Sequence, residues 1–295
     1  MLRSLRIGIV ALALVSFCAG SAGAYFERII TSSRVVATGG AFVSVADDAV
    51  AAYINPAGLT SLPTYNLLAT WNRPYGLDDV NEAFVAGGVS TGIGGFGASW
   101  FYRGISGVSA ENMLTLSYGR DLKRTSEDAS LSVGAFVDLV RVSASDRFNA
   151  SDGAALLGLS AHMRPFPVIG VGYTIRNINE TTLHLVDGGV GTALERQQSF
   201  GGSWFWDQRL IVSYERRQDS VGEWHNHGGI EFTFEQYVTL RTGISGRDAS
   251  AGFGLAYRGI TFDVGVSSHD VLGATYVVSF GYGPPAPALP YAQNP

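Results

Sequence analysis

The sequence predicts an all-β protein, a transmembrane antiparallel β-barrel of about 14 strands with a small N-terminal helical hatch. Charged residues make up only 15% of the chain, well below the roughly 25% of soluble domains. Beyond the N-terminal region, the chain has no apolar stretch of about 18 residues, which excludes a helical membrane protein. From about Tyr65 onward, short segments alternate apolar with small or polar residues, as expected for strands between lipid and a lumen.

Residues 1–24 have the layout of a secretory signal peptide. Basic Arg3 and Arg6 precede an apolar run that ends at Phe17, and small residues follow. The run is shorter than the roughly 20 residues of a spanning helix, although an uncleaved anchor is the alternative. Cys18 falls inside this segment, so we expect the mature chain to have no disulfide, cysteine-based metal site or thiol nucleophile.

Residues 25–62 are predicted to form the hatch. They combine an acidic pair, an alanine-rich stretch and an Asn-Pro-Ala-Gly turn. We expect Ser44 or Asp47 to cap a short helix that the turn ends. Adjacent acids at a helix start usually act as capping and dipole partners, with a cation site or an acid/base pair as the alternative. The candidate hatch residues are Asp47, Asp48, Asn55, Pro56, Ala57 and Gly58.

Residues 63–282 are predicted to form the barrel. In one segment Ile260, Phe262 and Val264 alternate with Thr261 and Asp263. Segments of about 9 to 11 residues match a tilted span of the hydrocarbon layer. Strands are expected to begin near residues 64, 82, 93, 111, 129, 153, 167, 195, 208, 226, 236, 249, 260 and 274. Aromatic residues near segment ends suit girdles at the two membrane interfaces; they are Trp71, Tyr75, Trp100, Tyr102, Tyr118, Trp204, Trp206, Tyr214, Tyr257 and Tyr282.

The connections alternate between short and long, which predicts short periplasmic turns and longer outside loops. The longest, Asn177–Leu194, is expected to be an extracellular cap or recognition element. The last segment ends in aromatic residues, as barrels recognised by the outer-membrane assembly machinery do. The Pro-rich residues 283–295 lack apolar periodicity and are predicted to be a disordered periplasmic tail.

Alternation also places charged residues on or near the lumen face. Facing lipid near the midplane, each would cost about 2 to 4 kcal/mol, whereas opposite signs on neighbouring strands can pair inside. We favour a structural role, in which these residues hydrate the lumen or hold the hatch, over a conduction path or latch. The candidate lumen residues are Asp138, Glu231, Arg241, Arg258 and Asp263, and Glu215 lies on the same face.

Several other classes of function are disfavoured. A net charge of −5 argues against a nucleic-acid partner. The pattern Gly92–Gly97 fits a dinucleotide-binding loop, but a strand rather than a helix follows it, so we interpret these glycines as turn and close-packing residues. His225 and His227 could face the same side of a strand, without a third metal ligand nearby. No catalytic motif surrounds His162, His184 or His269, so we expect neither an enzyme nor a cofactor.

Residues 36–62 resemble the N-terminal hatch of the FadL/TodX family of outer-membrane transporters, and are similar to its shorter PorV/PorQ-like relatives. The resemblance rests on Asp47-Asp48-Ala49 and Asn55-Pro56-Ala57-Gly58-Leu59. It implies a plugged barrel in the outer membrane of a Gram-negative-type bacterium, surrounded by lipid, that acts as a passive channel for hydrophobic or amphipathic small molecules. The alternative, which the short chain favours, is a PorV-like protein that docks a secretion or surface-attachment partner.

Overall fold

The structure, a computed structural model, describes residues 25–26, 28–124, 129–144, 150–185, 191–207, 209–219 and 222–284. The predicted signal peptide, and the predicted tail beyond residue 284, lie outside these residues. Among the helices of the described residues, none is long and apolar enough to cross a membrane.

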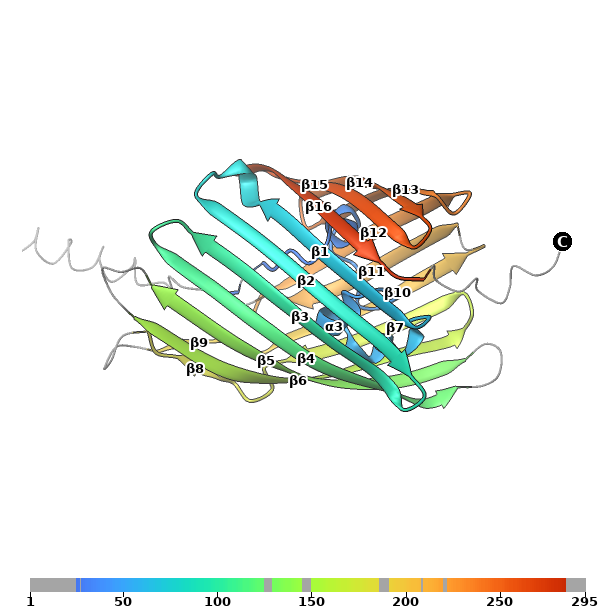
Figure 1. Cartoon of the computed structure of the whole chain (residues 1–295), viewed down its shortest axis with the longest axis horizontal. Helices are drawn as coiled ribbons and strands as arrows, with labels where there is room; N and C mark the ends of the chain where they lie inside the picture. The colour runs from blue at the N-terminus through green and yellow to red at the C-terminus, as the bar shows by residue number, and fades with distance from the viewer. Residues whose placement is uncertain are drawn as a thin grey trace, which may run out of the picture.

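The described strands form one closed antiparallel barrel of fourteen strands, so the predicted fold class is confirmed (Figure 1). Each strand begins within two residues of its predicted position. Closure comes from β1 against β16, with Leu67 opposite Tyr282 and Arg73 opposite Tyr276. The strands are β1 (Tyr65–Arg73), β2 (Val80–Thr91), β3 (Gly94–Ile105), β4 (Ser109–Arg124), β5 (Ser130–Ala144), β6 (Ser151–Phe166), β7 (Ile169–Arg176), β10 (Gln197–Trp206), β11 (Leu210–Gln218), β12 (Trp224–Phe234), β13 (Val238–Ser245), β14 (Asp248–Tyr257), β15 (Ile260–His269) and β16 (Gly273–Tyr282).

The two ends of the barrel differ in their connections. One end, called here the long-loop end, carries the 3₁₀ turn η2 (Pro74–Gly76) and the small hairpin of β8 (Thr182–Leu183) and β9 (Thr192–Ala193). It lies on the left in Figure 1. The other, the short-turn end, has connections such as Arg258-Gly259 between β14 and β15, and β16 ends there. The predicted loop 177–194 thus contains the β8–β9 hairpin.

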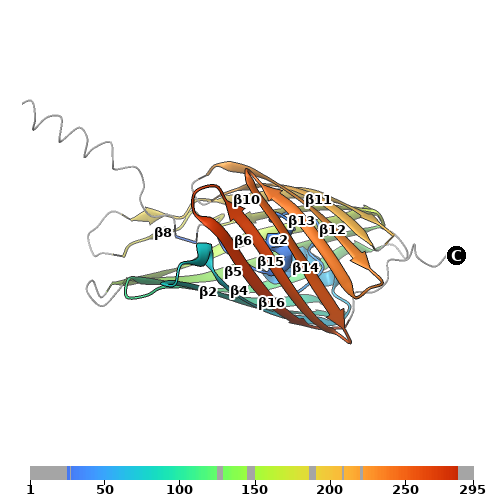
Figure 2. The same ribbon diagram turned by 90° about the horizontal axis from the view of Figure 1, so that it is seen from above.

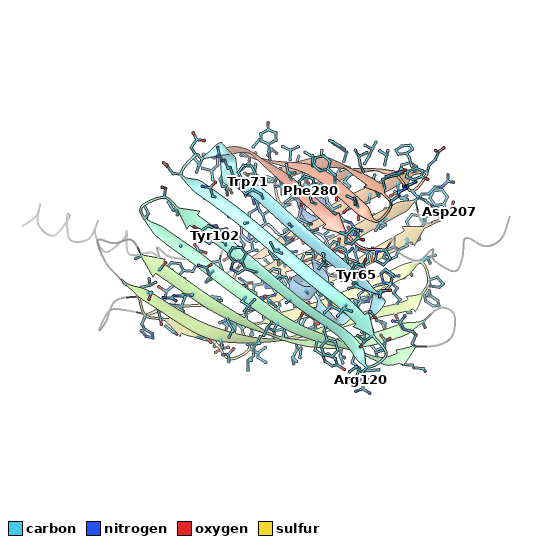
Figure 3. The ribbon with its side chains drawn as sticks, in the orientation of Figure 1. Tyr65, Trp71, Tyr102, Arg120, Asp207 and Phe280 are labelled. Carbon is cyan, nitrogen blue, oxygen red and sulfur yellow. The ribbon has the colours of Figure 1, made fainter. Side chains whose placement is uncertain are left out.

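The wall has an apolar outer face, as the alternation predicts, and an inner face of mostly small or polar residues that also carries buried Phe84, Phe101 and Phe136. On β5, Leu131 and Leu139 are exposed on the outside, whereas Ser132 and Asp138 are buried inside. Figure 3 shows Trp71 and Tyr102 on the wall toward the long-loop end, and Tyr65 toward the short-turn end. Tyr75 is a correction to the predicted girdle, because its position in η2 with φ of 55° turns it toward the lumen.

The hatch elements lie inside the barrel (Figures 1 and 2). They are α2 (Ser33–Ala37), α3 (Ala51–Ile54) and the 3₁₀ helix η1 (Pro56–Ser61). Ser32 caps α2, since its Oγ accepts a hydrogen bond of 3.1 Å from the Val35 amide.

The predicted capping of the alanine-rich helix was wrong. Helix α3 begins only at Ala51, its N-cap is Val50, and no side chain caps it. Asp48 Oδ1 instead accepts from the Val50 amide at 2.9 Å, in the turn before the helix. The Asp-Asp pair therefore lies too early to cap α3, and both carboxylates accept hydrogen bonds from Arg34 of α2.

Inward glycines bring the wall close to the hatch backbone. A Cβ at Gly134 would lie 2.6 Å from the Ala57 amide nitrogen, and one at Gly229 would lie 2.5 Å from the Thr38 carbonyl oxygen. Such contacts between inward glycines and the hatch occur on strands all around the barrel. The glycines that approach the hatch are Gly88, Gly95, Gly97, Gly119, Gly134, Gly170, Gly172, Gly201, Gly229, Gly243, Gly252 and Gly265. Gly95 and Gly97 are thus close-packing residues, as interpreted from the sequence.

Candidate functional site: the hatch and the cavity above it

A cavity of about 480 Å³ lies between the hatch and the long-loop end. Val36, Gly39 and Gly40 of the hatch line it, and residues near the strand ends, among them Asp219 and His269, line its rim. A volume of this size is within the range of small-molecule sites. The barrel is therefore blocked by its hatch and hollow above it.

The cavity lining is amphipathic. Apolar Phe26, Ile29 and Val35 contribute to it, as do Arg28 and His227. The Arg28 guanidinium donates to Ser267 Oγ at 3.1 Å and lies 3.6 Å from an Asp248 oxygen. His227 Nδ1 lies 2.7 Å from the Gly39 carbonyl oxygen, and the ring of Tyr75 meets that of His269 edge-on at 5.6 Å. In the part of the chain that the structure describes, Thr31 Oγ1 and Gln218 Oε1 are buried without hydrogen-bond partners.

Arg34 of α2 joins the hatch to the wall through ion pairs. Its Nε and Nη2 each donate to Glu231 of β12 at 2.9 Å, while Nη1 donates to Asp47 at 2.6 Å and to Asp48 at 3.0 Å. Arg241 continues the network, with 2.8 Å to Glu231 and 2.5 Å to Asp263. Three predicted lumen residues and the predicted acidic pair of the hatch thus share one network.

Burial raises the pKa of the Asp48 carboxyl to about 6, and nearby Arg34 opposes this shift. The Asp48 side chain is 17% exposed, so solvent reaches the network at this point.

Two further wall carboxylates are linked to the hatch backbone, one directly and one through an arginine. Glu215 Oε2 accepts from the Phe42 and Val43 amides at 2.8 Å each, and its Oε1 is 2.5 Å from Arg217. Asp138 is paired with Arg176, and Arg176 Nη2 donates to the Tyr53 carbonyl at 2.6 Å. Each acid therefore holds the hatch, either directly or through an arginine.

The Asn-Pro-Ala-Gly turn fits the wall without charge. Asn55 Nδ2 donates to the carbonyl oxygens of Val43 at 2.7 Å and Ala161 at 3.1 Å, and the Ala57 amide donates to Ser160 Oγ at 3.0 Å. Pro56, Ala57 and Gly58 are all buried. The whole predicted turn is therefore a structural anchor of the hatch in this closed state.

The predicted lumen residue Arg258 lies elsewhere. It occupies the turn between β14 and β15 with φ of 49°, is exposed, and its guanidinium lies 5.2 Å from the ring centroid of Tyr257. Alternation fails here because strand β14 ends one residue earlier, at Tyr257.

Sequence reasoning missed several functional residues, above all Arg34 and the cavity residues Arg28 and Tyr75. Arg34 lies in a segment with no strand or helix signal long enough to interpret. Its two acidic partners, Asp47 and Asp48, were the available clue, because acids placed inside a barrel need a cation. His225 and His227 both line the cavity, and the described residues contain no group of three or more His, Cys, Asp or Glu that could hold a metal ion.

A scan against protein-family models finds no match, and a search of curated proteins finds none either. Solved structures of similar backbone include the Pseudomonas putida toluene transporter TodX, with a TM-score of 0.61 and 13% identity, covering 87% of this chain and 97% of that one. The Ralstonia pickettii toluene transporter TbuX gives 0.59 at 12% identity, covering 88% and 99%. A Pseudomonas aeruginosa FadL homologue gives 0.58 at 13% identity, covering 87% and 99%. These likenesses show that the chain shares their barrel fold.

Proposed function

We propose that this barrel resides in the outer membrane and is a passive channel for hydrophobic or amphipathic small molecules, gated by its hatch. The cavity above the hatch carries the proposal, because it offers a small molecule apolar side chains such as Ile29 together with polar ones such as Arg28. The named transport activities of the similar TodX and TbuX barrels support it. In the proposed orientation of the barrel in the membrane, the long-loop end faces the outside of the cell and the short-turn end faces the periplasm.

Transport in this scheme needs no covalent step. A ligand enters at the long-loop end, leaves water to contact the apolar side chains of Ile29 and Val35, and binds above the closed hatch. Release toward the short-turn end then requires a movement of the hatch, since its residues fill the lumen: Ala51, Ala57 and Leu59 have no exposed surface.

A cavity-filling variant tests the proposal. Val36→Trp places a large ring in the cavity, whereas Val108→Trp places the same ring at an exposed loop tip outside it. We expect cells with the wild-type protein or V108W to take up radiolabelled toluene or decanoate faster than cells without the protein, and V36W to abolish the difference. Uptake that is equal with and without the wild-type protein would overturn the proposal.

Native mass spectrometry of the gently extracted protein separates the transporter from a PorV-like docking protein. Small adducts that V36W removes support the channel. A stoichiometric protein partner on an empty barrel instead supports docking of a secretion or surface-attachment system.

A further inference from the structure

The hatch consists of two parts that contact different sides of the barrel. Helix α2 lies against β13–β16, whereas α3 and η1 lie against β2–β6. Residues 41–50 connect them across the lumen, where Glu215 holds the chain by two amides. A movement of the hatch therefore need not involve both parts.

The second part is packed as the interior of a protein is. The segments of α3 and η1 carry no charged residue. Backbone atoms of Pro56 and Ala57 meet the inward glycines Gly119 and Gly134, and Leu59 is completely buried. Displacing this part would separate closely packed surfaces and leave a void in the lumen, which is costly.

Helix α2 also lies close to inward glycines, since a Cβ at Gly265 would lie 2.6 Å from the Ser33 carbonyl oxygen, but it is a thin barrier and makes ion pairs as well. Its five residues form little more than one turn. Val35 and Val36 line the cavity on one side, whereas Arg34 enters the ion-pair network on the other. Side chains of Arg34 and Asp47 are 15% and 24% exposed. Glu231 and Asp263 of the same network lie three residues from the short-turn ends of β12 and β15, so the network is on that side of the hatch.

Arg34 balances the negative charge of the ion-pair network that holds α2 to the wall. Four carboxylates, those of Asp47, Asp48, Glu231 and Asp263, surround two guanidinium groups, Arg34 and Arg241. Without Arg34, the acids of the hatch and Glu231 of the wall would repel one another. Because water reaches the network, hydration can replace these ion pairs when α2 moves, whereas α3 and η1 carry no charged group that water could stabilise.

Building on the proposed function, we propose that α2, with residues 29–40, is the moving part of the hatch and that Arg34 is its latch. Release of Arg34 from Asp47 and Glu231 lets α2 leave the wall and opens the cavity to the short-turn end along β12–β15. Helix α3 and η1 remain in place.

Two engineered disulfides of matched geometry test which part moves. Ser33 Oγ lies 2.9 Å from Ser279 Oγ, and Thr60 Oγ1 lies 3.0 Å from Ser132 Oγ, so either pair of cysteines can reach bonding distance. We expect S33C/S279C to reduce uptake of the probes to the level of cells without the protein, with recovery on reduction. We expect T60C/S132C to transport like the wild type in both states. Block by both disulfides, or by T60C/S132C alone, or by neither, overturns the proposal.

Hydrogen–deuterium exchange tests the latch without transport. Arg34→Gln should accelerate exchange of the amides of residues 33–40 and leave those of residues 51–61 unchanged, while Arg34→Lys, which keeps the charge, should accelerate it less. Equal acceleration of both parts, or of neither, contradicts the assignment of Arg34. Absence of uptake by the wild-type protein would refute the proposed function, and the exchange result would still decide on the latch.

Discussion

Replacement of Gly229 by alanine should loosen α2 without affecting the barrel. Gly229 faces inward on β12, and an added Cβ would lie 2.5 Å from the Thr38 carbonyl oxygen and 2.6 Å from the Thr38 Cβ. Thr38, which ends α2, would have to retreat by about 1 Å to restore ordinary contact distances. Overpacking of this kind costs about 1 to 3 kcal/mol.

The adjacent residue provides the control. Gly228 faces outward, and its added Cβ would meet Ile244 Cγ2 at 3.7 Å and Ser213 O at 3.9 Å, which are ordinary contacts. Gly228→Ala should therefore be neutral or slightly stabilising, because glycine inside a strand is disfavoured by roughly 0.5 to 1 kcal/mol relative to alanine. Both variants change the same strand by one methyl group, so only the contact with the hatch differs.

Hydrogen–deuterium exchange of residues 33–40 measures the effect. A loss of about 1 to 3 kcal/mol corresponds to exchange that is roughly 5- to 150-fold faster in Gly229→Ala than in Gly228→Ala. The strands should exchange alike in the two variants, because neither change removes a backbone hydrogen bond between strands. Equal exchange of residues 33–40 in both variants would show that close packing of Thr38 on β12 does not hold α2.

Three further predictions follow from the contacts of the hatch and the wall. Glu215→Gln should raise exchange at Phe42 and Val43 by an amount equivalent to about 1.5 to 3 kcal/mol, because both amides lose a charged acceptor; unchanged exchange would contradict the role of Glu215. The pKa of Asp48 is about 6 in the docked hatch and near 4 when the hatch is undocked, so ionisation of Asp48 opposes docking. Docking should therefore strengthen by about 1.4 kcal/mol as the pH falls from 7 to 5. Hydrogen exchange of residues 49–54, corrected for intrinsic rates, should slow accordingly, and Asp48→Asn should abolish this trend. Leu116→Arg on the middle of the outer face should destabilise the folded barrel in lipid by about 2 to 4 kcal/mol, measured by denaturant unfolding in vesicles, and an unaltered midpoint would argue against contact with lipid.

The barrel was predictable because its signal is repeated. The strands alternate an apolar outer face with an inner face of mostly small or polar residues, and turns separate the strands, so the start of each strand could be placed within two residues. The ends were less predictable. Arg258 would face the lumen if β14 continued, but local turn geometry ends the strand at Tyr257.

The candidate site was predictable only in part because its parts are distant in the sequence. Alternation correctly placed Asp138, Glu231 and Asp263 inside, but their partners come from several strands and from the hatch. Arg34 lies 197 residues from Glu231, and α2 is too short to give a periodic signal. Its capping serine, Ser32, was the one local sign of a helix start.

The contacts of the hatch at the junction of the first and last strands bear on how the molecule is assembled. The hatch touches strands on both sides of this junction, with α2 against β13–β16 and with α3 and η1 against β2–β6. At that junction Thr70 of β1 and Ser279 of β16 face each other at 2.8 Å, while Thr70 also donates to the Thr31 carbonyl and Ser279 accepts from the Ser33 amide. A slip of two residues between β1 and β16 would keep every side chain on its proper face, so alternation alone cannot prevent it. The groups that bind Ser279, the Thr70 hydroxyl and the Ser33 amide, specify one alignment. The hatch therefore helps to set the register of β16 against β1.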